Sequence, residues 1–121
     1  MAGAPLPNST VPLRVYLLGA FRLEHNGQLR RLPTRKDESL LAYLVLHPES
    51  HSREKLAALF WGDTSDEQAR TSLRTALAAI RKELGDDVLT ADREKVQLNP
   101  AFPLWIDIRE IFDLRFSIAD F

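Results

Sequence analysis

The stretch from residue 65 to residue 85, SDEQARTSLRTALAAIRKELG, constrains the fold most because it carries a single strong period. Its large apolar residues recur at intervals of four, three and four, which places them on one face of an α-helix. They are Leu73, Leu77, Ile80 and Leu84. The sequence therefore predicts one long helix that buries this stripe against the rest of its domain.

Both ends of the predicted helix carry boundary signals. Ser65, followed three residues later by Gln68, fits a capping box, and Asp66 and Glu67 suit the positive end of the helix dipole. Gly85 can adopt the left-handed conformation that closes a helix. We therefore expect the helix to begin just after Ser65 and to end at Gly85.

The other face of this helix is basic and carries small side chains, and no acidic residue lies between Gln68 and Lys82. Its candidate DNA contacts are Arg70, Thr71, Arg74, Thr75, Ala78 and Arg81. Arginine can fork onto guanine, threonine can reach bases or phosphates, and alanine leaves room for close approach. The alternative is a core helix with a solvated basic face. The helix alone favours that alternative, so the rest of the chain has to decide.

The first third of the chain predicts a small antiparallel sheet, because apolar and polar residues alternate there. The expected strands cover residues 13–17, 21–24 and 28–32. Asn26 and Gly27 favour a type I′ hairpin turn, since both tolerate a positive φ. Leu29 and Leu32 are the expected inward residues of the third strand.

Two further helices are predicted before the long one. Thr34 can cap a helix that runs to about His47, Pro48 stops it, and Ser52 can cap another that ends near Trp61. The expected inward residues are Leu40, Leu41, Leu44 and Val45 in the first helix and Leu56, Leu59 and Phe60 in the second, with Trp61 as a core anchor.

A second hairpin is expected after Gly85. Residues 88–90 and 95–98 flank a polar turn that places Arg93 and Lys95 at or near its tip. Three helices followed by such a hairpin are the plan of a winged helix-turn-helix, whose third helix enters the major groove while the hairpin meets the neighbouring backbone or minor groove. We therefore expect an α+β fold: a winged helix-turn-helix with an N-terminal antiparallel sheet, three helices and a C-terminal β-hairpin wing. This context favours the DNA-binding interpretation of the long helix.

The chain divides into three expected regions. Residues 1–12 contain three prolines and are predicted to form a disordered leader, residues 13–104 the winged-helix domain, and residues 105–121 the start of a following region. Within that last region an extended segment over 105–107 and a short helix over 108–116 are expected.

Composition adds limits. The net charge is −1, with residues 1–36 carrying +5 and residues 37–67 carrying −5, so DNA binding would rest on one basic face and few phosphate contacts. Cysteine is absent, which excludes disulfides and thiolate chemistry. The longest apolar run, residues 40–46, is far shorter than the roughly 20 residues of a membrane span, and residues 1–12 lack a signal peptide's basic and apolar parts. A cytoplasmic location without membrane association is expected.

The segments LLAYLVLHPESHSREKLAALFWGD and QARTSLRTALAAIRKELG resemble the DNA-binding domain of SARP-type transcriptional activators, bacterial regulators built on an OmpR/PhoB-type winged helix. The resemblance spans roughly residues 13 to 98. The matching positions are Leu40 to Leu44, Phe60, Trp61, Ala69, Arg70, Leu73, Arg74, Leu77, Ile80 and Arg81. One departure lies in the wing, where this chain has Lys95 to Leu98 and the family often has Gly-Tyr-x-Leu.

The resemblance implies a four-stranded N-terminal sheet, or nearly so, and head-to-tail binding to direct repeats of double-stranded DNA. It also implies contact with RNA polymerase, with Asp63, Asp66 and Glu67 as candidates. A helical bacterial transcriptional activation domain usually follows in this family, and the segment from Trp105 to Phe112 resembles its first step.

The remaining candidates each have a plain alternative. Arg93 and Lys95 are expected phosphate contacts or else ordinary turn residues, and Arg35 could meet a phosphate at a helix N-terminus or be a solvated cap. His47 and His51 are four residues apart, but Pro48 breaks the helix that would align them, so no metal site is expected.

No nucleophile context and no phosphate-binding glycine spacing is present, so neither an enzyme nor a cofactor is expected. The competing hypothesis is a winged helix that serves as a protein-interaction or dimerisation module of a larger regulator.

Overall fold

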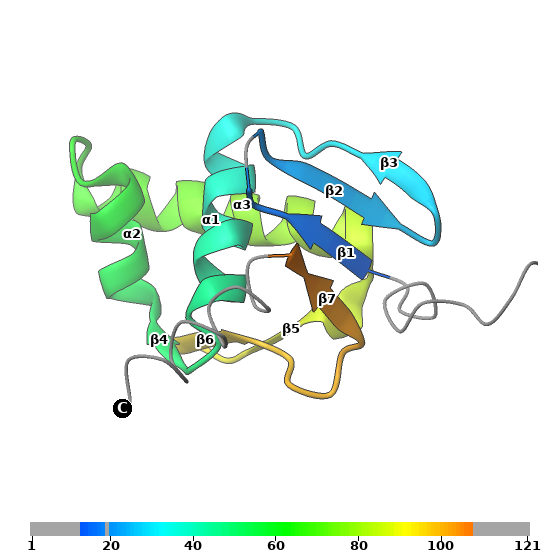
Figure 1. Ribbon diagram of the computed structural model, residues 1–121. Helices are drawn as coiled ribbons and strands as arrows, with labels where there is room; N and C mark the ends of the chain where they lie inside the picture. Colours follow the sequence, from blue (N-terminus) through cyan, green and yellow to red (C-terminus); the bar gives the residue numbers. More distant parts are fainter. Residues whose placement is uncertain (1–12, 19, 108–121) are drawn as a thin grey trace, which may run out of the picture. The chain divides into compact units, whose positions relative to one another are not determined.

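The computed structural model describes residues 13–18 and 20–107 (Figure 1). In this part the chain is a mixed α+β structure with three α-helices, one short 3-10 helix and two small sheets. It divides into two compact units, one spanning Leu32–Phe102 and the other containing the residues before and after that span. The leader expected over residues 1–12 and the helix expected over 108–116 lie outside the described residues.

The first unit is a four-stranded sheet with the strand order β3-β2-β1-β7. Its strands are β1 (Leu13–Tyr16), β2 (Arg22–His25), β3 (Gln28–Arg30) and β7 (Leu104–Ile106). The predicted tight turn between β2 and β3 is confirmed, because Asn26 and Gly27 have φ values of 55° and 81°. The three N-terminal strands are antiparallel, as expected.

The fourth strand changes the character of this sheet. β7 pairs with β1 in parallel, with Leu13 opposite Leu104 and Val15 opposite Ile106, so the sheet is mixed and not purely antiparallel. Asp107 follows β7 and accepts the backbone N–H groups of Leu17 and Leu18 at 2.8 and 3.1 Å. The boundary expected after residue 104 therefore falls inside a strand of this sheet.

The prediction that Leu29 faces inward is wrong. Its side chain is 67% exposed, whereas Leu32 is buried. Leu29 pairs with Glu24, next to the buried Leu23 on β2, so strand alternation puts it on the opposite face. Two residues three apart cannot share one face of a strand, and Leu32 lies beyond the end of β3.

The second unit contains the helices α1 (Arg35–Leu46), α2 (Arg53–Trp61) and α3 (Asp66–Leu84). All three predicted caps are confirmed. The hydroxyls of Thr34, Ser52 and Ser65 accept the backbone N–H groups of Asp37, Lys55 and Gln68, respectively. α3 packs against both α1 and α2, as Figure 1 shows.

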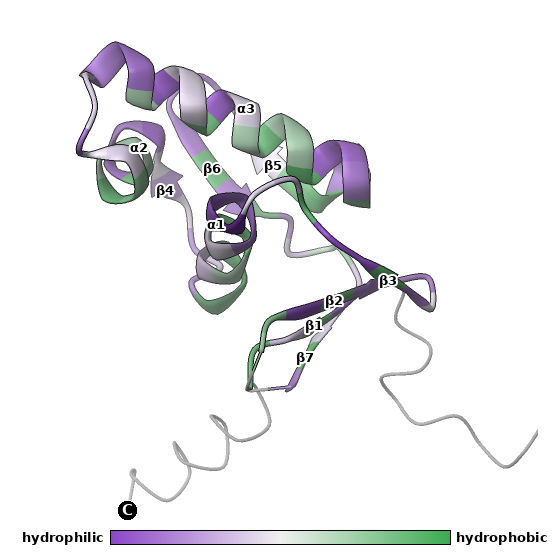
Figure 2. Ribbon diagram, turned by 90° about the horizontal axis from the view of Figure 1, so that it is seen from above, coloured by the Kyte–Doolittle hydropathy of each residue, from purple (hydrophilic) through white to green (hydrophobic). Residues whose placement is uncertain are grey.

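The core of this unit is the predicted one along α1 and α3. Leu40, Leu41, Leu44 and Val45 of α1 are buried, and so is the whole α3 stripe of Leu73, Leu77, Ile80 and Leu84. Hydrophilic and hydrophobic residues alternate along α3 in Figure 2, as expected of a helix with one buried face.

The inward face of α2 differs from the prediction. Leu56 and Ala57 are buried, whereas Leu59 is 59% exposed. At about 100° per residue, Leu59 lies roughly 110° around the helix from the midpoint between Leu56 and Ala57. Phe60 and Trp61 are half-buried at the end of the helix, so Trp61 is not the core anchor that was expected.

The predicted second hairpin is present. A 3-10 helix, η2 (Asp86–Val88), leads into β5 (Leu89–Ala91), and β6 (Lys95–Leu98) returns antiparallel to it. A two-residue strand that was not predicted, β4 (His51–Ser52), pairs with the other edge of β6 and gives the order β4-β6-β5.

Gly85 has the positive φ that was expected at the end of α3, but its φ of 106° and ψ of 153° lie in a region that essentially only glycine occupies, and not in the left-handed helical region. The helix nevertheless ends there.

Candidate functional site

The outward face of α3 presents most of the predicted contact residues to solvent. Arg70, Thr71, Arg74, Thr75 and Ala78 are exposed, because the neighbouring stripe is buried and helical geometry turns these positions away from it. Thr75 Oγ1 donates to the Thr71 carbonyl at 3.0 Å, so its proton is used within the helix while its lone pairs stay free to accept.

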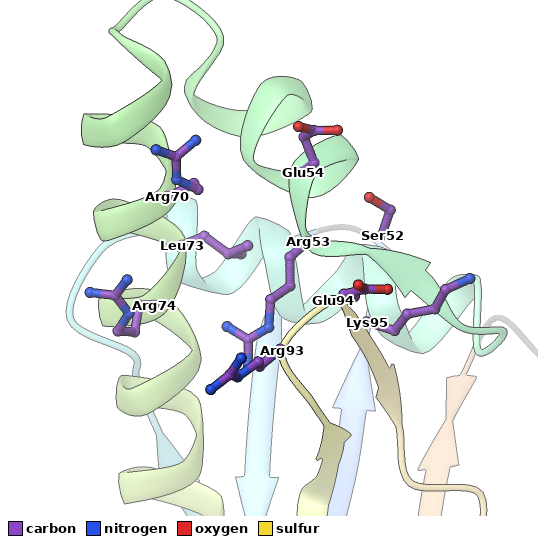
Figure 3. Close-up of a pocket in the computed structure, with 9 residues that line it drawn as sticks. All are labelled: Ser52, Arg53, Glu54, Arg70, Leu73, Arg74, Arg93, Glu94 and Lys95. Atoms are coloured by element: carbon purple, nitrogen blue, oxygen red, sulfur yellow. The ribbon is translucent and has the colours of Figure 1, made fainter.

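A groove of about 460 Å³ lies between α3, the start of α2 and the tip of the β5–β6 hairpin. Its lining residues are Ser52, Arg53, Glu54, Arg70, Leu73, Arg74, Arg93, Glu94 and Lys95 (Figure 3). Five of them are basic and two are acidic. The structure therefore brings four predicted residues together, Arg70 and Arg74 from α3 and Arg93 and Lys95 from the hairpin.

A second hollow of about 320 Å³ continues along α3. It is lined by Arg53, Arg74, Leu77, Ala78, Arg81, Lys82 and Asp86. Arg53 and Arg74 line both hollows, so the two adjoin. We call them together the basic groove.

The tip of the hairpin is held by Asp92. Its Oδ1 accepts the backbone N–H groups of Lys95 at 2.7 Å and Glu94 at 2.8 Å, while the Asp92 N–H donates to the Lys95 carbonyl at 2.9 Å. These two N–H donors, that of Lys95 before that of Glu94, hold the pKa of Asp92 below its ordinary value, and the charges of Arg53 and Lys95 act in the same direction. The turn thus presents Arg93 and Lys95 from a fixed backbone.

Arg53 belongs to the basic groove, although the sequence analysis did not single it out. Its Nε donates to the Asp92 carbonyl at 2.7 Å, and its backbone N–H donates to the Glu94 carbonyl at 2.8 Å. One sequence signal could have found it. Arg53 is the first residue of α2, where the helix dipole disfavours a cation. A positive charge at this position therefore indicates a role other than stabilising the helix.

Arg81 lies differently from the other α3 arginines. It lines the second hollow, but its side chain is half-buried and its Nη2 reaches the Leu89 carbonyl of β5 at 3.5 Å. Its Nε is buried and has no hydrogen-bond partner among the described residues. The guanidinium is therefore directed in part toward the base of the hairpin.

Some predicted residues lie outside the basic groove. Thr71 and Thr75 stand on the exposed side of α3 without lining either hollow, and neither does Arg35, the exposed first residue of α1. The polymerase-contact candidates are exposed in the turn after α2 and in the first turn of α3; they are Asp63, Asp66 and Glu67.

The cations that line the first hollow form no salt bridge with a described residue, and only the Asp92 carboxylate acts on two of them, Arg53 and Lys95, at longer range. Two salt bridges lie within the four-stranded sheet, from Glu24 to Arg14 at 3.4 Å and to Arg22 at 3.8 Å. Arg53, Arg70, Arg74, Arg93 and Lys95 form none with a described carboxylate. Like charges brought together in this way repel one another, so an anion bound among them would be favoured.

The two histidines considered as metal ligands contact each other at the end of α1. His51 Nε2 lies 2.7 Å from the His47 carbonyl oxygen, and the two rings are 6.5 Å apart. Over residues 13–18 and 20–107, no three or more metal-ligating side chains gather into one group. No helix in this part of the chain has both the length and the apolar character needed to cross a membrane.

The chain matches no protein-family model and no curated protein sequence.

Proposed function

We propose that this protein binds double-stranded DNA in a sequence-specific manner as a winged helix-turn-helix transcriptional regulator. The observation that carries the proposal is the basic groove. There α3 and the β5–β6 hairpin present arginine and lysine side chains, and those that line the first hollow form no salt bridge with a described carboxylate. DNA phosphates would supply the missing negative charge.

In this proposal α3 enters the major groove. Arg70 and Arg74 lie one turn apart on its exposed face and can reach guanine edges or phosphates, while the exposed Ala78 permits close approach of the helix. The β5–β6 hairpin acts as the wing, with Arg93 and Lys95 on the neighbouring backbone or in the minor groove. Base contacts would set specificity and the wing would set position.

The resemblance to SARP-type activators supports a further part of the proposal. Head-to-tail binding to direct repeats would bring successive copies into contact on DNA, and the exposed acidic side chains Asp63, Asp66 and Glu67 would be available to RNA polymerase. Their place beside α2 and the start of α3 leaves the basic groove free for DNA.

The first test is the substitution Arg74→Ala. Duplex binding, measured by fluorescence anisotropy with a labelled duplex selected from a random pool, should weaken at least tenfold, because Arg74 lines both hollows of the groove. Thermal unfolding should be nearly unchanged, since the side chain is exposed. Unaltered affinity of both Arg74→Ala and Arg70→Ala across a salt titration would show that α3 is not the recognition helix.

A second candidate function is a protein-interaction or dimerisation module without DNA binding of its own. The observation in its favour is the acidic segment over residues 37–67, which carries −5, together with the net charge of −1. In that case the wild-type protein would show no salt-dependent duplex affinity. The same titration therefore separates the two candidates.

A further inference from the structure

Arg53 occupies the point where α2, the hairpin tip and both hollows of the basic groove meet. We propose that Arg53 contacts a phosphate of the DNA backbone and at the same time fixes the hairpin tip in its binding geometry. This inference rests on the proposed function and adds to it a residue that links the wing to the helix–turn–helix.

The contact with the tip is made by two different groups of Arg53. Its side-chain Nε donates to the Asp92 carbonyl, and its backbone N–H donates to the Glu94 carbonyl, which also satisfies one of the free N–H groups at the start of α2. Asp92 in turn orders the tip through the backbone N–H groups of Glu94 and Lys95. The conformation that presents Arg93 and Lys95 is therefore tied to Arg53.

The rest of the guanidinium remains available. Arginine has five N–H donors in a planar fork, and the Nε–H is the one that Arg53 spends on Asp92. Its two Nη groups donate to no other described residue. Figure 3 shows the Arg53 side chain extending into the groove across from Arg70 and Arg74, near Arg93. A phosphate oxygen could accept from both Nη groups together.

The surroundings favour a duplex backbone over a small free anion. Glu54 and Glu94 share the rim of the first hollow and weaken the binding of a single anion there. The cations are distributed along α3 and across to the hairpin, so several phosphates of one duplex could meet them together. The position of Arg53 against the helix dipole is a local cost that phosphate binding would offset.

Two substitutions separate the two roles of Arg53. Arg53→Gln keeps an N–H donor the same number of bonds from Cα as the arginine Nε, so it can retain the Asp92 contact without the charge. Arg53→Lys keeps the charge but places a methylene group where Nε–H stands. Arg22→Gln, in β2, is the control for the loss of one positive charge, because Arg22 lines neither hollow.

The experiment measures anisotropy of a fluorescein-labelled mixed-sequence duplex between about 50 and 200 mM salt, and amide spectra of Glu94 and Lys95 in the free protein. Arg53→Gln should lower affinity about tenfold at the low-salt end and reduce the log–log salt slope by about 0.9, leaving both amides in place. Arg53→Lys should keep the wild-type slope but shift both amides, and Arg22→Gln should change neither.

Wild-type affinity and slope in Arg53→Gln would overturn the phosphate contact, and unshifted amides in Arg53→Lys would overturn the role at the tip. Loss of the proposed function itself looks different. The wild-type protein would then show no salt-dependent duplex binding at all, which would also overturn the phosphate contact of Arg53. The amide spectra of Glu94 and Lys95 would still show whether Arg53 holds the hairpin tip.

Discussion

Asp92, a single residue at the hairpin tip, both holds the turn by hydrogen bonds and carries a charge near Arg53 and Lys95. Asp92 is exposed, yet its carboxylate is the acceptor that holds the turn. Protonation or substitution at this one surface position would therefore alter how Arg93 and Lys95 are presented, although no core contact is touched.

Asp92 gives a prediction about pH. Its pKa in the folded protein is lowered, so its contribution to the order of the tip is fully present above the ordinary aspartate value of about 3.9 and is lost as pH falls through the depressed folded pKa. Amide resonances of Glu94 and Lys95 followed by NMR should therefore move at a pH below that ordinary value. The substitution Asp92→Asn should abolish this transition, and a midpoint at or above the ordinary value would contradict the hydrogen-bonding account.

Residue-level expectations succeeded where local rules decide them and failed where tertiary packing does. The buried stripe of α3 followed from its spacing, and Asn26-Gly27 from turn chemistry. Leu29 and Leu59 are exposed although both were expected inward, because apolar character alone does not say which side of a short strand or helix meets the core. Arg53 was missed because its partners lie about forty residues away in the hairpin.

Among the elements, α3 contributes both to the core and to the basic groove. It packs against α1 and α2 with one face and lines the basic groove with the other, so its burial and its proposed recognition role are coupled through one rigid helix. Its core side chains fix the rotation of the helix about its own axis. That rotation decides which side chains face the basic groove, and so which would reach DNA in the proposed binding mode.

The substitution Leu77→Ala should destabilise the fold by roughly 2–5 kcal/mol, because it removes a buried side chain and leaves a cavity. Leu59→Ala is the matched control, since it makes the same chemical change at an exposed position and should stay within about 0.5 kcal/mol. Both are read from urea or guanidinium unfolding curves. Equal effects of the two substitutions would mean that the helices are rotated from the arrangement described.

Element boundaries followed from the sequence where caps and turns mark them. The starts of α1, α2 and α3 are all set by Ser or Thr hydroxyls that the sequence shows directly. β4 and β7 are different. β4 has two residues and was not predicted, whereas the extended segment expected over residues 105–107 overlaps the three residues of β7. The sequence did not predict the partner of either strand, because a distant strand supplies the hydrogen bonds of each.

For the whole molecule, charge distribution matters more than the total. A net charge of −1 gives no reason to expect a nucleic-acid partner, yet five cations meet around one groove. The groove could be predicted in part, because Arg70, Arg74, Arg93 and Lys95 were identified from helix faces and turn position. Their convergence depends on the contact of the hairpin with α2, which is a property of the folded chain.

The pairing of β7 with β1 gives a prediction at the same scale. Removing the residues from Pro103 onward takes away β7 and Asp107, and so exposes one edge of β1 and leaves the N–H groups of Leu17 and Leu18 without their carboxylate. Hydrogen exchange at Leu13–Tyr16 should accelerate markedly in the truncated protein. Unchanged protection there would show that β7 contributes little to the sheet.

The short strand β4 has a consequence for the energetics of association. By pairing with β6, it makes the hairpin part of a three-stranded sheet anchored directly to the start of α2, so the hairpin is not a free arm. A tip that is already ordered surrenders little conformational entropy when it meets a ligand. The conformational entropy of ordering the tip is therefore lost during folding and not on binding. A substitution far from the groove that destabilises the fold could then also weaken binding at the groove.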